Sequence, residues 1–177
     1  MKLVVNTYLS NTNELHPYLI ESICRLRSMD YKPIVKITYN NSFQVNHICY
    51  INFLEVLRFY KDEDLLIAED DLFINKNYEE LKILLENKKG IVRCAYQHSP
   101  KSIKGKDGHF YIGTQLTFIA KDYINTLIEI MEKSKPQHLD LYFSKNKEIL
   151  IEKIDSIGDE IEHYSNIAKG IRKGKIL

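Results

Sequence analysis

The sequence has no tryptophan, only three cysteines and no long apolar run. The three cysteines, Cys24, Cys49 and Cys94, are an odd number and are widely spaced, which argues against a disulfide framework. They form no Cys-x-x-Cys pair, which argues against a structural zinc site. We expect them to be small core residues of a protein in the reducing cytoplasm. No apolar stretch approaches the roughly 20 residues that cross a bilayer, and the apolar part of the N-terminus is too short for a signal peptide.

The chain also lacks a basic excess and a phosphate-binding loop. Its 25 Lys and Arg residues face 24 Asp and Glu residues, a net charge of +1, which argues against a dedicated duplex-DNA binder. Neither Gly-x-Gly-x-x-Gly nor Gly-x4-Gly-Lys-Ser/Thr occurs, so a dinucleotide-binding dehydrogenase or a P-loop nucleotidase is not expected. A diphosphate ligand would therefore need a metal ion to balance its charge.

Along the 177 residues, segments with strand-like spacing of apolar residues alternate with segments of helix-like spacing. Short β-branched runs predict strands at 3–8, 33–39, 65–68, 91–96, 110–120 and 149–154. Three-and-four spacing predicts helices at 13–29, 45–60, 78–87, 121–133 and 139–143, with Gly90 as the cap of the third. This alternation favours a single-domain, Rossmann-like α/β fold with a mostly parallel sheet flanked by helices. We place the domain at 1–168 and a basic tail at 169–177.

Three consecutive carboxylates, Glu69, Asp70 and Asp71, follow the apolar run 65–68, and apolar residues resume at Leu72. Such close like charges repel, so a fold tolerates them best around a cation, and hard oxygen ligands suit Mg²⁺ or Mn²⁺. In an extended segment Glu69 and Asp71 point to one side and Asp70 to the other. We expect Asp71 to bind metal directly, with Asp70 or Glu69 holding a ribose hydroxyl or a metal-bound water. A solvated acidic turn is the alternative.

With this strand and triplet, the chain resembles the nucleotide-sugar glycosyltransferases of GT-A fold, and is most similar to small ones of the lipopolysaccharide type. Three further segments carry the resemblance. Residues 3–8, Leu-Val-Val-Asn-Thr-Tyr, resemble the first strand, whose end meets the nucleobase. Residues 111–119 resemble the strand that carries small residues near the donor sugar. Residues 161–166, Ile-Glu-His-Tyr-Ser-Asn, resemble a late segment that supplies another metal or diphosphate ligand.

The resemblance implies a GT-A-like fold and transfer of a sugar from a nucleotide-diphosphate sugar, with Mn²⁺ or Mg²⁺. The acceptor would be a glycan, a lipid-linked molecule or a protein, with no nucleic acid as partner. The implied donor-binding residues are Tyr8, Thr7, Glu69, Asp70, Gly113 and Gln115; the implied metal ligands are Asp71, Glu69 and His163; and the implied catalytic residue is Asp140.

Some of these residues have an alternative role to the one that the resemblance implies. His163 is either a metal ligand or a hydrogen-bonded structural residue. Asp140 is a general base that takes the acceptor's proton if the reaction inverts the configuration of the sugar, or a residue that positions the acceptor if the configuration is retained. The alternative without a catalytic role is a helix cap. The basic residues 172–175 either contact acidic lipid at a membrane surface or a diphosphate, or are solvated.

Two other functions fit the same residues. Clustered carboxylates also build the sites of metal-dependent nucleases and phosphohydrolases. A catalytically inactive, nucleotide-sugar-binding module is the non-enzymatic alternative, because the chain is short for the family it resembles.

Overall fold

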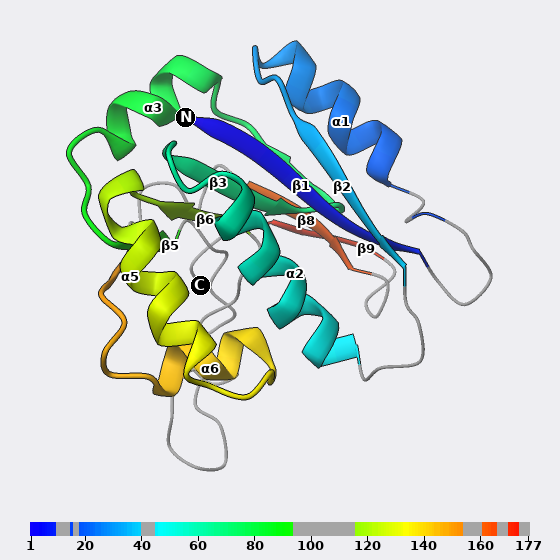
Figure 1. Cartoon of the computed structure of the whole chain (residues 1–177). Helices are drawn as coiled ribbons and strands as arrows, with labels where there is room; N and C mark the ends of the chain where they lie inside the picture. The colour runs from blue at the N-terminus through cyan, green and yellow to red at the C-terminus, as the bar shows by residue number, and fades with distance from the viewer. Residues whose placement is uncertain are drawn as a thin grey trace.

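The computed structural model describes residues 1–9, 15, 18–39, 45–93, 116–153, 161–165 and 170–173. A six-stranded sheet in the order β2-β1-β3-β6-β5-β7 forms its centre (Figure 1). Its strands are β1 (Lys2–Leu9), β2 (Ile34–Tyr39), β3 (Leu65–Glu69), β5 (Ile91–Arg93), β6 (Leu116–Ile119) and β7 (Ile151–Lys153).

The sheet is mostly parallel, as the alternating pattern predicts. β1 pairs in parallel with β2 and β3, and β5 pairs in parallel with β7. β6 is antiparallel to both β3 and β5, so it alone of the six runs in the opposite direction. The carboxyl ends of β1, β2 and β3 therefore meet at one edge of the sheet, which is where such sheets bind ligands.

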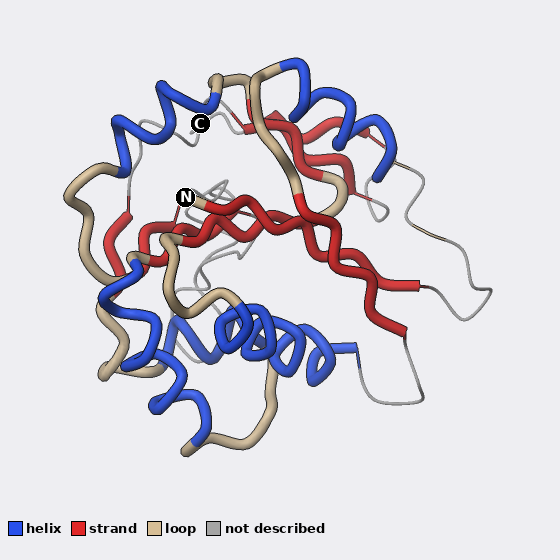
Figure 2. The backbone as a smooth tube through the Cα atoms, turned by 45° about the horizontal axis from the view of Figure 1, so that its top comes forward, coloured by secondary structure: helices blue, strands red, loops and turns tan. Residues whose placement is uncertain are grey.

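Helices cover both faces of this sheet, as Figure 2 shows. On one face lie α1 (Leu19–Ser28) and α3 (Tyr78–Leu85), whose buried residues share an apolar core with Val5, Leu66 and Ala68. On the other lie α2 (Val45–Phe59), α5 (Lys121–Glu132) and α6 (Leu139–Lys145), packed on Val4 and Ile67. Successive strand residues alternate between these two cores, as a pleated strand buried on both faces requires.

The buried face of α2 does not follow a simple three-and-four spacing of its apolar residues. Ile51 is 40 % exposed, whereas Tyr50, Asn52 and Phe53 are buried. Because α2 is apolar over most of its circumference, residue spacing alone does not single out the inward face. Arg58 at its C-terminal end pairs with Glu132 of α5, with Nη2 2.6 Å from Oε1.

Glycine at position 90 has a different role from the predicted helix cap. The N-cap of α3 is Asn77, which forms a reciprocal capping box with Glu80, and the residue with positive φ after the helix is Asn87 (66°). Gly90 has φ of 75°, and a Cβ there would lie 2.7 Å from the carbonyl oxygen of Leu150. A glycine is therefore needed where the chain enters β5 beside the segment leading to β7.

A second sheet of three strands, in the order β4-β8-β9, lies beside α1. Its strands are β4 (Leu72–Ile74), β8 (Ile161–Ser165) and β9 (Gly170–Lys173), all antiparallel to their neighbours. The sequence did not predict a strand directly after the carboxylates, nor a strand within the segment 169–177. No helix in the described part of the chain is both long enough and apolar enough to traverse a bilayer.

Candidate functional site

The three carboxylates lie where β3 ends, at the carboxyl edge of the central sheet. Glu69 is the last residue of β3 and is paired in register with Asn6 of β1. Asp70 and Asp71 form the turn into β4. Asp71 is only 7 % exposed, whereas Glu69 and Asp70 are half-buried. The turn is thus partly enclosed, which an ordinary solvated acidic turn would not be.

Asp70 turns toward the face of the sheet that α1 covers. The hydroxyl of Thr7, which is fully buried on β1, donates a hydrogen bond to Asp70 Oδ2. Val5, two residues earlier, belongs to the core beneath α1 and α3. This contact brings together two residues predicted for donor binding, and it fixes one side of the carboxylate turn.

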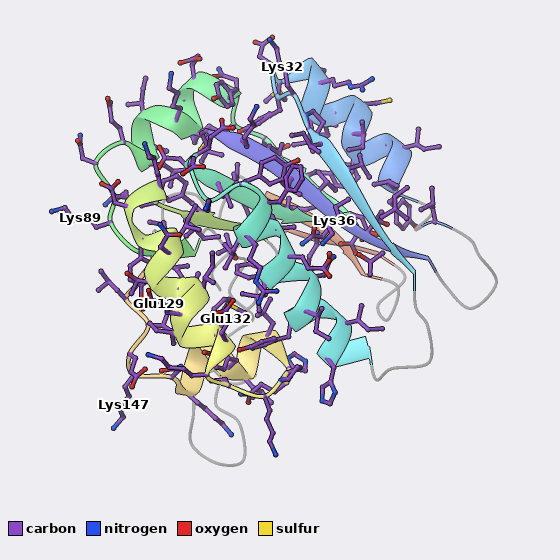
Figure 3. All side chains as sticks on the ribbon, viewed as in Figure 1. Lys32, Lys36, Lys89, Glu129, Glu132 and Lys147 are labelled. Carbon is purple, nitrogen blue, oxygen red and sulfur yellow. The ribbon has the colours of Figure 1, made fainter. Side chains whose placement is uncertain are left out.

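Glu69 and Asn6 belong to the opposite face, beneath α2. Asn6 is paired in register with Lys36 of β2, and Lys36 Nζ lies 2.6 Å from Glu55 Oε2 and 3.4 Å from the Asn52 carbonyl oxygen, both on α2. Figure 3 shows Lys36 between β2 and α2. Glu69 and Asp70 therefore lie toward two different faces of the sheet, although only Glu69 belongs to the extended strand and Asp70 lies in the turn after it.

Three residues on β1, β2 and α2 have buried side-chain polar atoms without a hydrogen-bond partner among the described residues. They are Asn6 (Oδ1), Thr38 (Oγ1) and Asn52 (both Oδ1 and Nδ2), and Thr117 Oγ1 on β6 is a further such atom. Asn6 and Asn52 are 8 % and 1 % exposed. An unsatisfied buried polar group costs about 1–3 kcal/mol, so such a cluster needs a partner from water, from a ligand or from residues outside the described part of the chain. We call the three residues Asn6, Thr38 and Asn52 the polar recess.

The three residues of the polar recess were not predicted from the sequence. Asn52 lies one helical turn from both Ile48 and Val56, but only the burial of these two residues identifies its position as inward-facing. A polar residue on an inward helical face is uncommon unless it is partnered or has a function.

The late segment predicted to supply a metal ligand lies next to the carboxylate turn. β8 pairs with β4 in antiparallel register, with His163 opposite Leu72 and Glu162 opposite Phe73. Leu72 follows Asp71 directly in the chain. Backbone pairing therefore brings His163 close to Asp71, although the two are widely separated in sequence.

The remaining predicted site residues divide between the described and the undescribed parts of the chain. Tyr8 lies on β1, paired with Thr38, and Asp140 is the second residue of α6, whose N-cap is His138. The described structure extends to the backbone of Tyr8, Asp140 and His163, but not to their side chains. Gly113 and Gln115 lie outside the described residues.

The carboxylate turn fits a hard divalent cation by its donor chemistry. Half-buried and buried carboxylate oxygens are the ligands that Mg²⁺ and Mn²⁺ prefer. Within the described part of the chain, no three Asp, Glu, His or Cys side chains converge on one point. An ion held by Asp71 would therefore draw further ligands from a bound diphosphate or from β8.

Comparison with known proteins gives similarity in structure only. No protein-family model matches the sequence, and no curated protein matches it. Solved structures do match, and each of the three described next covers most of both chains.

A197 from STIV has a TM-score of 0.52 at 16 % identity, covering 94 % of this chain and 87 % of its own. A glycosyltransferase involved in the glycosylation of the major capsid of PBCV-1 has a TM-score of 0.53 at 11 % identity, and the match covers 86 % of this chain and 82 % of that one. The galactosyltransferase LgtC, in complex with donor and acceptor sugar analogs, has a TM-score of 0.51 at 12 % identity, and the match covers 88 % of this chain and 74 % of LgtC. The chain therefore has the GT-A fold, which confirms the fold predicted from the sequence.

Proposed function

We propose that the chain is a metal-dependent glycosyltransferase that moves a sugar from a nucleotide-diphosphate sugar to an acceptor hydroxyl. The observation that carries this proposal is the partly enclosed turn of Glu69, Asp70 and Asp71 at the carboxyl edge of a GT-A sheet. The glycosyltransferases with which the chain shares its fold support a sugar donor. Fold alone does not determine activity, so the proposal depends on the site.

In this proposal the donor lies across the carboxyl ends of β1 and β3. Asp71 holds Mn²⁺ or Mg²⁺, with Glu69 and His163 as further ligands. The bound ion would neutralise the negative charge that develops on the leaving diphosphate. Thr7, which is bonded to Asp70, orients that carboxylate toward the donor's ribose. Tyr8 stacks on the base, and Gly113 and Gln115 contact the donor sugar.

The polar recess supplies hydrogen bonds to the donor in the same proposal. Asn6 and Asn52 offer carboxamide oxygens and nitrogens, and Thr38 a hydroxyl, none of which is positively charged. Such groups suit the uncharged polar parts of a nucleotide sugar rather than its phosphates. They lie on the face of the sheet to which Glu69 belongs.

The acceptor hydroxyl attacks the anomeric carbon of the sugar. The bond from that carbon to the acceptor oxygen forms, and the bond to the diphosphate oxygen breaks with its electron pair leaving on the diphosphate. The acceptor's proton passes to Asp140 in an inverting reaction, which is the role we propose for this residue. A cytoplasmic location and contact with a membrane surface stay predictions, as does an acceptor that is a glycan, a lipid-linked molecule or a protein.

The central test is the substitution Asp71→Asn, which keeps the side chain's size but removes its charge. We expect wild-type protein to be thermally stabilised by at least one nucleoside diphosphate in the presence of Mn²⁺, and the variant to lose that shift. The matched control is Asp62→Asn, an exposed aspartate just before β3. An unchanged nucleotide shift in Asp71→Asn would rule out the proposed site.

Activity assays then separate the three candidate functions. A glycosyltransferase should slowly release nucleoside diphosphate from its own nucleotide sugar in a panel, because water can replace the acceptor. A nuclease or phosphohydrolase would instead cleave nucleic acid or phosphate esters. An inactive binding module would show the metal-dependent thermal shift and neither reaction.

A further inference from the structure

α1 packs against β4, the strand that leaves the carboxylate turn. The hydroxyl of Ser22, which is fully buried in α1, donates a hydrogen bond of 2.6 Å to the carbonyl oxygen of Leu72. Serine inside a helix usually bonds to its own helix or to water. Here it bonds to a strand 50 residues away in sequence.

Further contacts hold the rest of β4 and the segment after it. Arg25 of α1 donates a hydrogen bond to Asn75, and its guanidinium carbon lies 5.2 Å from the centre of the Phe73 ring. The hydroxyl of Tyr31, just after α1, donates to the carbonyl oxygen of Lys76 at 2.9 Å. Of these contacts, the Ser22 bond lies nearest in sequence to the carboxylates.

The carboxylate turn is thus fixed on two sides. Thr7 bonds to the side chain of Asp70, and Ser22 bonds to the backbone of Leu72. Asp71 lies between these two anchored residues and is itself buried. A metal site needs its ligands held within about half an ångström of the binding geometry, which requires supporting contacts of this kind.

We infer that Ser22 is a positioning residue for Asp71, and that its hydroxyl sets the affinity of the carboxylate turn for a divalent cation. The inference rests on the proposed function, since it assumes that Asp71 binds metal. Ser22 itself touches neither metal nor donor; it acts through the backbone of Leu72. Loss of supporting contacts around metal ligands typically weakens metal affinity about 10- to 100-fold.

The test compares Ser22→Ala with Tyr31→Phe. Each substitution removes one hydroxyl that donates to a backbone carbonyl on or just after β4, but only Ser22 is next to the carboxylate turn. Mn²⁺ binding is measured from the electron paramagnetic resonance signal of free Mn²⁺, alone and with ADP, CDP, GDP or UDP. Thermal unfolding of each variant is recorded alongside. We expect Ser22→Ala to weaken Mn²⁺ binding by roughly tenfold and Tyr31→Phe to leave it within about twofold.

A third variant, Ser22→Thr, separates positioning from stability. It keeps the hydroxyl and adds a methyl group at a fully buried position, so it should lower the unfolding temperature and yet retain Mn²⁺ affinity. Equal affinity in Ser22→Ala and wild type would overturn the inference, as would equal losses in Ser22→Ala and Tyr31→Phe. If wild-type protein binds no Mn²⁺ under any of these conditions, the proposed function itself fails, and the inference with it.

Discussion

At the scale of single residues, the polar recess has a cost to stability. Asn52 is 1 % exposed, and neither polar atom of its carboxamide has a partner among the described residues. A leucine of similar size would leave no unpartnered polar atom at this position. Groups kept at such a cost are typical of ligand sites, where stability and function oppose each other.

We therefore predict that Asn52→Leu raises stability while weakening nucleotide binding. Removing the unpartnered carboxamide should increase the free energy of unfolding by about 1 kcal/mol or more, which corresponds to ~2–4 °C in Tm for a chain of this size. The thermal shift caused by Mn²⁺ and nucleoside diphosphate should decrease. Differential scanning fluorimetry with and without these ligands measures both effects.

Thr117→Val is the matched control for this prediction. Thr117 Oγ1 is likewise buried and without a partner in the described part of the chain, but Thr117 is paired with Ile67, inside the sheet rather than at its edge. The control should gain stability and keep its nucleotide shift. A lower Tm for Asn52→Leu would mean that the carboxamide is satisfied in the folded protein, contrary to the prediction.

The charged residues of the site could be predicted from the sequence, whereas its neutral residues could not. Glu69, Asp70 and Asp71 stand out because three adjacent carboxylates at a strand end are costly without a partner. Asn52 and Ser22 do not, since one polar residue in an amphipathic helix is ordinary until its burial is known. Ser22 gains meaning only from its contact with Leu72, which no local pattern encodes.

At the scale of elements, tyrosine hydroxyls join the three helices on one face of the sheet. Tyr50 of α2 donates to the carbonyl oxygen of Met131 in α5 at 2.7 Å. Tyr142 of α6 donates to the Ile130 carbonyl oxygen at 3.1 Å, and the rings of Tyr50 and Tyr142 pack edge to face with centroids 5.0 Å apart. Burial, and after it the contact with Tyr142, raises the pKa of Tyr50 well above its usual value.

This raised pKa predicts a loss of stability at alkaline pH. In the unfolded chain Tyr50 ionises near pH 10.0, whereas in the folded protein it stays neutral to higher pH. The unfolded state therefore binds fewer protons above that pH, so this stabilising contribution is complete below pH 10 and is lost as the pH rises further. Urea unfolding at pH 8, 9, 10 and 11 should show the decline.

Tyr50→Phe assigns the effect to this residue. The variant should lose about 1 kcal/mol at neutral pH with the buried hydrogen bond, and its stability should then fall less steeply above pH 10. Tyr60→Phe, a half-buried tyrosine just after α2, serves as the control and should keep the wild-type slope. An identical alkaline decline in wild type and Tyr50→Phe would contradict the prediction.

The predicted elements agree with the structure where local pattern determines them. Four elements differ from prediction by a single residue at one end: the strands at 34–39 and 65–69 and the helices at 45–59 and 121–132. β4 was missed because three residues are too few to show a period. β8 and β9 depend on pairing with distant strands, which local spacing does not reveal.

At the scale of the whole molecule, the apolar cores do not depend on the site. Both cores consist of aliphatic and aromatic side chains on the two faces of the central sheet, and the carboxylates lie at its edge. A bound ion would therefore add stability only by its own binding free energy. This differs from small metal-dependent domains, which unfold when the metal is removed.

We predict accordingly that chelation leaves the fold intact. Purified protein treated with EDTA should keep its far-UV circular dichroism spectrum and nearly the same Tm. The extra stabilisation by nucleoside diphosphate should disappear and return on adding Mn²⁺. Loss of secondary structure on chelation would instead indicate a structural metal.

The overall fold was predictable because the order of elements limits the alternatives. Strands alternating with helices require a mostly parallel sheet covered on both faces, and the ligand edge follows from strand direction. The reversed β6 and the separate small sheet were not predictable, because strand order and direction depend on contacts distant in sequence.

The pairing of β4 with β8 also bears on how the protein folds. β4 follows β3 directly, whereas β8 comes after all six strands of the large sheet along the chain. Closing a long loop costs more entropy than closing the short loops between neighbouring elements, so contacts distant in sequence tend to form late. We therefore expect β8 to pair with β4, beside the carboxylate turn, after the large sheet has formed.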